Sequence, residues 1–265
     1  MPYLMKPPGK PAFMKLAIET TCLVRDFGSF RAVNELDLRV EEGRFYGFLG
    51  PNGAGKSTTL KMLTGLLTPT SGTIRVLGED ISDPKCALAV RRRIGVVPEN
   101  LALFDNLTAR EYLTFVGRMY QVPRETVRQR RDELLEMMDL VHDEGKLTCE
   151  FSHGMKKKLA LAAALIPDPD LLFLDEAFEG VDAVACKVLR DTLKRCVERG
   201  ATVFLTSHVL EIVEKLCTDI GIISHGRMVH QGTMEELQRA GTLEDKFISV
   251  VGENPEGSKM LSWLE

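Results

Sequence analysis

One eight-residue pattern limits the folds open to this chain more than any other feature. The apolar run Phe45 to Leu49 leads directly into Gly50-Pro-Asn-Gly-Ala-Gly-Lys-Ser57, which fits G-x-x-x-x-G-K-[ST], and Leu60 and Leu63 follow at helical spacing. A strand, a glycine-rich turn and a helix therefore succeed one another. In this order the turn can wrap around a phosphate group, because glycines let its amides point inward and the helix N-terminus adds partial positive charge.

The pattern assigns roles to individual positions. We expect Lys56 to neutralise the β- and γ-phosphates of a nucleotide and the Ser57 hydroxyl to ligate magnesium. A glycine turn that only joins a strand to a helix is the alternative, and the flanking strand and helix favour the phosphate site. The residues expected to contact the nucleotide here are Gly50, Pro51, Asn52, Gly53, Ala54, Gly55, Lys56, Ser57 and Thr58.

Four more short apolar runs predict further strands of an α/β fold. Their apolarity is continuous rather than alternating, which is typical of strands covered on both faces in a parallel sheet. Two capping boxes, Thr108 with Glu111 and Thr233 with Glu236, predict helix starts. The four runs are Ile94 to Val97, Leu171 to Leu174, Val203 to Leu205 and Ile220 to Ile223.

The chain divides into a central domain and two terminal segments. Between about 100 and 166 helical patterns follow one another without strand signals, as in Leu134, Met137, Met138 and Val141, so we expect a helical insert. Residues 1–15 contain tandem prolines and are expected to be a flexible lead-in. Residues 241–265 have little periodicity, and we assign no role to this tail.

Composition excludes several classes of protein. A net charge of -4 gives no general attraction to nucleic acid, and 44% apolar with 27% charged residues is ordinary for a globular protein. The longest nearly apolar stretch, Leu159 to Ile166, is too short to cross a bilayer, and no secretory signal is expected. Six scattered cysteines without a C-x-x-C pair indicate reduced thiols rather than a zinc site.

An acidic pair follows the predicted strand Leu171 to Leu174. We expect Asp175 to hold magnesium through a water molecule and Glu176 to face the γ-phosphate and polarise the attacking water. Taken alone, two acids after a strand are equally consistent with a solvated strand end or a helix N-cap. The glycine loop upstream favours the catalytic interpretation.

Four more motifs complete a series with a characteristic order. Phe27-Gly28 precedes the glycine loop, and Ser152-His-Gly154, Gly180-Val-Asp182 and Ser207-His208 follow it. With this spacing the chain resembles the ATP-binding cassette (ABC) ATPases from about residue 16 to residue 240, particularly those of bacterial exporters. The resemblance implies a P-loop NTPase fold, with a parallel-sheet core, an N-terminal antiparallel β-subdomain and a helical subdomain insert.

The resemblance also implies functional roles. Phe27 would stack on adenine with Val33 as an apolar companion, Asp182 would contact a partner subunit, and the neutral imidazole of His208 would bond the γ-phosphate. The signature is a variant, since Phe151, His153 and Met155 depart from LSGGQ whereas Ser152 and Gly154 match. Ser152 can cap the following helix and Gly154 lets an anion approach the backbone.

Lysines 156 to 158 stand in the first turns of the helix that Ser152 is expected to cap. Positive charge there opposes the helix dipole unless an anion screens it. The three lysines therefore suit a helix start that faces phosphate. The alternative is a solvated basic face on an ordinary surface helix.

Glu99, in Ile94-Gly-Val-Val-Pro-Glu99, is the most informative departure, because glutamine is usual at this position in the family. Its carboxylate can still ligate magnesium or bond water, but it adds negative charge to an anionic site. Slower or more magnesium-dependent hydrolysis is therefore expected. Related exporter ATPases with a serine-histidine-glycine signature often have the same acid, so we do not interpret it as inactivation.

The resemblance implies partners as well. In the family, ATP is held between the phosphate loop of one subunit and the signature of another, so a homodimer or heterodimer and a polytopic membrane permease are expected. Leu103 and Phe104 are candidate contacts with the permease, although core packing explains them equally well. We expect a cytoplasmic protein held at the inner face of the membrane; a non-transport or regulatory ABC ATPase with little turnover is the alternative.

Overall fold

A computed structural model describes residues 15–252, so the predicted N-terminal segment lies outside the described residues except for Lys15. Its centre is a six-stranded sheet in the order β10-β9-β3-β8-β7-β6, in which β10 is antiparallel and the other neighbours are parallel. The strands are β3 (Phe45–Leu49), β6 (Ile94–Val97), β7 (Leu171–Asp175), β8 (Thr202–Ser207), β9 (Asp219–Ser224) and β10 (Arg227–Thr233). All five predicted strands are confirmed.

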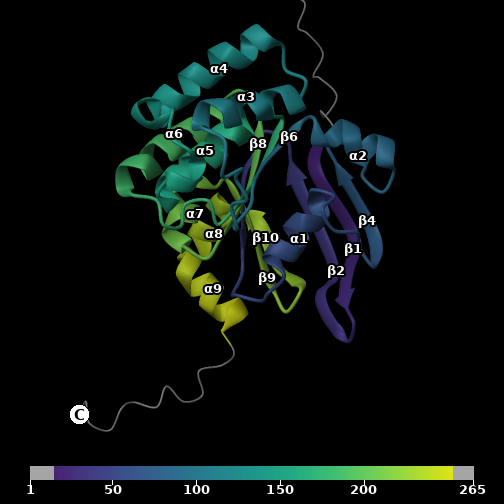
Figure 1. Ribbon diagram of the computed structural model, residues 1–265. Coiled ribbons are helices and arrows are strands. Elements are labelled where there is room, and N and C mark those ends of the chain that lie inside the picture. Colours follow the sequence, from purple (N-terminus) through teal and green to yellow (C-terminus); the bar gives the residue numbers. More distant parts are fainter. Residues whose placement is uncertain (1–14, 253–265) are drawn as a thin grey trace, which may run out of the picture.

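A second, antiparallel sheet lies on one side of the central sheet (Figure 1). Its order is β2-β1-β4-β5, and its strands are β1 (Leu16–Phe27), β2 (Phe30–Glu41), β4 (Ser71–Val76) and β5 (Glu79–Asp80). The expected N-terminal β-subdomain is therefore present. Its apolar side chains pack with those of α1 (Lys56–Leu63) and α2 (Pro84–Arg91) against the central sheet.

Four aromatic rings join the middle strands of the central sheet on that side. The Phe204 ring on β8 lies 5.6 Å from Tyr46 and 5.3 Å from Phe48, both on β3, and 5.7 Å from Phe173 on β7, measured between ring centroids. All four are buried. Aromatic contacts at these distances add to the free energy of burial, so the strands that carry the site are firmly packed.

Helices cover the other face of the central sheet (Figure 1). The insert consists of α3 (Ala109–Met119), α4 (Arg124–Met137), two short 3₁₀ turns (Val141–Asp143 and Thr148–Glu150) and α5 (His153–Leu165). The remaining helices are α6 (Ala183–Glu198), α7 (Leu210–Leu216), α8 (Met234–Ala240) and α9 (Leu243–Val251). Both predicted capping boxes are present, at the starts of α3 and α8.

Two helices end before their apolar patterns do. α4 ends at Met137, and α1 ends at Leu63 although Leu67 continues its spacing. Helix α9 is a larger difference, because we found little periodicity in the sequence after residue 241 and predicted no helix there. Thr242 caps α9, and Leu243, Phe247 and Val250 pack against the core at i, i+4 and i+7, a pattern that could have predicted this helix.

Two expectations about the chain as a whole can be compared with the structure. Within residues 15–252 every helix is either too short or too polar to span a bilayer. All six cysteines are free thiols, as their scattered positions indicated.

Candidate active site

The glycine loop leaves the end of β3 and is shaped by two close backbone contacts. A Cβ atom on Gly50 would collide with the carbonyl oxygen of Ile223 on the neighbouring strand β9. Gly55 has φ 107°, and a Cβ atom there would lie 2.6 Å from the carbonyl oxygen of Ala32. Larger residues are therefore excluded at both positions, and the loop is held between β2 and β9.

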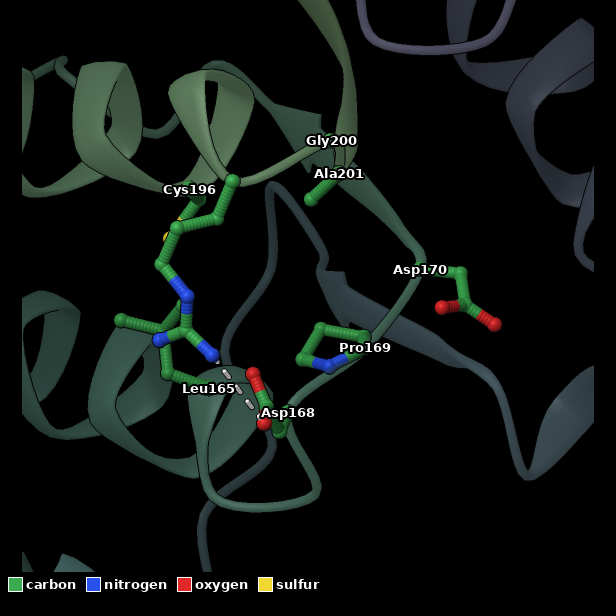
Figure 2. Close-up of a pocket in the computed structure, with 8 residues that line it drawn as sticks. Leu165, Asp168, Pro169, Asp170, Cys196, Gly200 and Ala201 are labelled. Atoms are coloured by element: carbon green, nitrogen blue, oxygen red, sulfur yellow. Dashed lines mark ion pairs between the residues drawn. The ribbon is translucent and has the colours of Figure 1, made fainter.

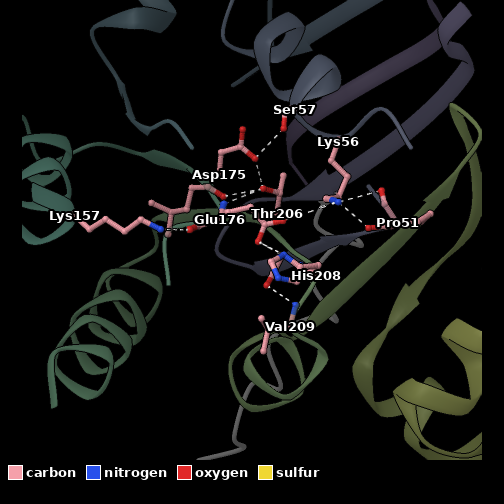
Figure 3. Close-up of polar contacts among 12 residues, drawn as sticks. Pro51, Lys56, Ser57, Lys157, Asp175, Glu176, Thr206, His208 and Val209 are labelled. Atoms are coloured by element: carbon pink, nitrogen blue, oxygen red, sulfur yellow. Dashed lines mark hydrogen bonds and ion pairs between the residues drawn. The ribbon is translucent and has the colours of Figure 1, made fainter. Parts of the chain in front are cut away.

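Lys56 begins α1, and its ammonium group lies inside the loop. The side chain is 7% exposed, and Nζ donates hydrogen bonds to the carbonyl oxygens of Gly50 at 2.7 Å and Pro51 at 3.3 Å. Nζ also lies 4.0 Å from Glu176 Oε1 (Figure 3). A buried cation beside a helix N-terminus makes this loop suitable for an anion.

Asp175 ends β7 directly opposite Thr206 of β8. Its Oδ1 accepts hydrogen bonds from Thr206 Oγ1 at 2.5 Å and Ser57 Oγ at 3.4 Å. The carboxylate is thus aimed at the start of α1, where Ser57 also presents its hydroxyl oxygen (Figure 3).

This donor set fits magnesium. The carboxylate of Asp175 and the hydroxyl of Ser57 are hard oxygen ligands on one edge of the sheet, and Mg²⁺ is commonly held by one or two such groups together with substrate phosphates and water. Within residues 15–252 no cluster of three or more His, Cys, Asp or Glu side chains could hold a metal ion by itself.

Glu176 is buried and has a left-handed backbone, with φ 49°, which is unfavourable for a residue with a side chain. Its N–H donates to Thr206 at both the hydroxyl and the carbonyl oxygen, at 3.2 Å each. Its Oε2 lies 3.0 Å from Nδ1 of His208 and 3.4 Å from the backbone nitrogen of His208. The predicted base and the predicted switch histidine are therefore in direct contact.

One pocket collects most of the predicted site residues. It combines the glycine loop with Glu99, which is exposed just after β6, and with Glu176 after β7. Two residues of the site were not predicted from the sequence. Phe30 could have been found, because an aromatic residue upstream of a glycine loop is a usable signal. Thr206 could not, because no sequence pattern marks it. The lining residues are Phe30, Ala32, Asn52, Gly53, Gly55, Lys56, Ser57, Thr58, Glu99 and Glu176.

The two residues expected at adenine differ in accessibility. Val33 is fully buried in the core between the sheets, so its assignment to adenine was wrong: its side chain packs behind the loop, close to Gly55. Phe27 is 46% exposed, and the guanidinium of Arg25 lies 4.6 Å from its ring centroid. Adenine stacking on Phe27 stays a prediction, and Phe30 is the aromatic residue that lines the pocket.

The signature residues and Asp182 lie outside this pocket. Ser152 caps α5 as predicted, accepting a hydrogen bond from the Met155 N–H at 3.2 Å. Gly154 faces the carbonyl oxygen of Gly180, so the start of α5 and the segment before α6 are neighbours. The Asp182 carboxylate accepts from the Ala185 N–H and caps α6, and this bond lowers the pKa of Asp182.

We expected the three lysines at the start of α5 to face phosphate or solvent, and one of them does neither. Lys157 is 3% exposed, and its Nζ donates a 2.8 Å hydrogen bond to the carbonyl oxygen of Glu176 (Figure 3). Our interpretation was therefore wrong for this residue. The helix turns Lys157 toward the sheet because successive residues point about 100° apart around a helix.

A different pocket lies between α5, α6 and the start of β7 (Figure 2). It contains the exposed ion pair Arg199–Asp168, at 3.6 Å, and the partly buried thiol of Cys196. None of the nucleotide motifs reaches it, so we assign it no ligand.

Comparisons with known proteins agree with this geometry. The sequence model of the family described as "ABC transporter" matches residues 33–179. The bacitracin transport ATP-binding protein BcrA of Bacillus licheniformis is 39% identical over 227 residues, which is 85% of this chain and 72% of BcrA. This chain belongs to the ABC transporter family.

Further relatives support the same assignment. The daunorubicin/doxorubicin resistance ATP-binding protein DrrA of Streptomyces peucetius is 41% identical over 223 residues, covering 84% of this ABC ATPase and 67% of DrrA. A solved structure described as the ATP-binding subunit of an ABC transporter superposes with a TM-score of 0.83 at 27% identity, covering 88% of this chain and 99% of the other. The ABC fold and a nucleotide-hydrolysing, ATP-binding subunit are thereby established.

Thr206 provides a direct test of this arrangement in the ABC ATPase. Thr206→Val keeps the shape of the side chain but removes the hydroxyl that bonds Asp175 and Glu176. Leaving buried polar groups unpaired costs about 1–3 kcal/mol, so we expect ATP hydrolysis to fall about tenfold or more. Steady-state ATPase rates measure this, with Thr206→Ser, which keeps the hydroxyl, near wild type. A wild-type rate in Thr206→Val would contradict the role of the hydroxyl.

Proposed function

We propose that this chain binds MgATP at the Gly50–Thr58 loop and hydrolyses it to drive a separate membrane subunit that exports its substrate. The observation that carries the proposal is the contact of Glu176 with both Lys56 and His208 at the mouth of the loop. A base, a cation and a histidine at one point suit the γ-phosphate end of a nucleotide. Drug-resistance and antibiotic-transport relatives support export.

Each residue of the site has its own role in the proposed binding and hydrolysis of ATP. Lys56 and the loop amides hold the β- and γ-phosphates, and a magnesium ion held by Ser57 and Asp175 would neutralise charge on the phosphate oxygens. Glu176 accepts a hydrogen bond from the attacking water and orients it. His208 bonds the γ-phosphate and keeps the Glu176 carboxylate in place, as its 3.0 Å contact supports.

Ser152, Gly154 and Asp182 are assigned to the nucleotide of a partner subunit. Their position outside the chain's own pocket supports this assignment, as does the presence of one phosphate loop and one signature in the sequence. Two subunits arranged head to tail, identical or related, would complete two sites. ATP bound between them favours the dimer by mass action, and hydrolysis removes that contribution.

The helical layer offers a surface for the membrane partner. An apolar groove beside α3 includes Leu101, Leu103 and Tyr112, and the exposed ring of Phe104 packs edge-on against Phe115. Exposed aromatic clusters are typical of protein interfaces. We propose that the permease docks here and holds the chain at the cytoplasmic face of the membrane.

A regulatory ABC subunit with little turnover is the second candidate. Glu99 leaves room for it, because this carboxylate lines the same pocket as Glu176 and adds negative charge where the triphosphate would bind. The altered signature residues His153 and Met155 leave room for it too, whereas Lys56, Asp175, Glu176 and His208 together favour hydrolysis. Measured turnover separates the two candidates.

Glu176→Gln is the first test. The amide keeps the size of the side chain but cannot accept a proton, so we expect hydrolysis to fall by about two orders of magnitude or more while ATP still binds. ATPase assays and equilibrium ATP binding measure both quantities. Negligible rates in wild type and Glu176→Gln alike, with intact ATP binding, would favour the regulatory subunit.

Glu99→Gln tests the effect of the additional carboxylate. Removing its charge should raise turnover by about two- to tenfold at limiting magnesium, because less repulsion opposes the nucleotide and its ion. Rates measured across a magnesium titration give the answer. Unchanged kinetics at every magnesium concentration would show that Glu99 does not influence the site.

Phe104→Asp tests the docking surface. Gentle isolation of the wild-type protein from membranes should copurify a polytopic membrane protein, identifiable by mass spectrometry, and Phe104→Asp should reduce its recovery at least about fivefold, because a carboxylate is costly to bury in an apolar interface. Ile248→Asp on α9, similarly exposed, is the matched control. Recovery of a ribosome or a DNA-repair complex would overturn the transport proposal.

A further inference from the structure

Lys157 is a buried cation that takes no part in the proposed binding of MgATP. It belongs to the first turns of α5, the helix that begins at Ser152, yet only 3% of the residue is exposed. Burying an ammonium group is strongly unfavourable unless partners compensate, so the contacts of Lys157 should show what it contributes.

The Lys157 ammonium contacts the backbone of the predicted base. Nζ donates to the carbonyl oxygen of Glu176 at 2.8 Å, and the same oxygen accepts a longer bond, 3.2 Å, from the N–H of Glu179. A hydrogen bond from a charged donor is stronger than one between neutral groups. The peptide that follows Glu176 is therefore oriented mainly by a side chain from the helical insert.

That peptide needs external support. Glu176 has φ 49°, a conformation that is unfavourable for a residue with a side chain and persists only where neighbouring contacts hold it. Thr206 holds the N–H of Glu176 and Lys157 holds its carbonyl oxygen. Between these two anchors the carboxylate is directed to His208 and Lys56 (Figure 3).

The carboxylates around Lys157 also favour its charged form. Burial lowers the pKa of the Lys157 ammonium, and the carboxylates of Glu179, Glu176 and Glu99 act in the opposite direction. The ammonium thus places positive charge among acids of the site, including the Glu99 that replaces the usual glutamine.

We propose that Lys157 is a positioning residue for hydrolysis: it fixes the strained backbone of Glu176 from the signature helix and thereby sets the direction of the base. The inference rests on the proposed role of Glu176. Lys157 belongs to α5, whose N-terminus is assigned to the nucleotide of the partner subunit. A displacement of α5 would therefore move the Glu176 carbonyl oxygen and turn the Glu176 carboxylate away from the attacking water. One lysine thus links the signature of a subunit to the base of the same subunit.

Lys157→Met is the test, since methionine fills much of the same space without a donor or a charge. We expect kcat to fall about 10- to 100-fold, because a base displaced by about 1 Å loses that much rate, while KM and the Kd for ATP stay within about threefold. Lys157→Arg, which restores a charged donor, should recover at least about a third of kcat. Lys194→Met, an exposed lysine on α6, is the matched control and should equal wild type.

The outcomes separate this inference from the proposed function. A wild-type kcat in Lys157→Met, with Glu176→Gln inactive, overturns the positioning role alone. Parallel loss of kcat, ATP binding and thermal stability overturns it too, since that pattern indicates a purely structural lysine. Near-wild-type hydrolysis by Glu176→Gln means instead that the proposed role of Glu176 has failed.

A second variant keeps the inference testable if Lys157→Met does not fold. Lys157→Ala leaves space for a small amine, so added ethylammonium should raise its ATPase rate at least about fivefold, whereas tetramethylammonium, which has no N–H donor, should not. Equal responses to both cations would overturn the positioning role.

Discussion

The parallel pairing of β7 with β8 places Asp175 directly opposite Thr206, and the pairing of β8 with β3 places Ser207 beside Leu49. Because these strands run in the same direction, three loops leave one edge of the sheet within a few ångströms of each other. The phosphate loop follows β3, the acidic pair closes β7 and His208 follows β8. Every contact at the site depends on this register, which the buried ring of Phe204 helps to hold.

Charge burial is the second constraint. Lys56, Lys157, Asp175 and Glu176 are each less than 10% exposed, although charged groups are rarely buried without partners. Each of them has a hydrogen bond or an opposite charge within reach, and the Thr206 hydroxyl makes two of these bonds. Such a network is rigid because removing one member leaves others unsatisfied. Rigidity is useful where a carboxylate must orient a water molecule.

Helix α5 connects the pocket of this chain with the proposed partner subunit. Ser152 and Gly154 stand at the exposed start of α5, away from the pocket of their own chain, whereas Lys157 on the same helix reaches the Glu176 backbone. The proposed dimer and the proposed positioning role therefore involve the same end of one helix. A partner's nucleotide at the helix start and the Glu176 backbone would be joined through about one helical turn.

Local sequence determined a large part of this protein. The strand-loop-helix around Gly50–Ser57, the five parallel strands, the capped starts of α3 and α8 and the motif order were all readable, because each depends on neighbours in the chain. Only the tertiary structure decided that Val33 is buried, that Phe30 lines the pocket, that Thr206 bonds the acidic pair and that Lys157 turns inward. Those properties come from contacts between segments far apart in sequence. The motif pattern identifies what each segment can do, and packing decides which atoms meet.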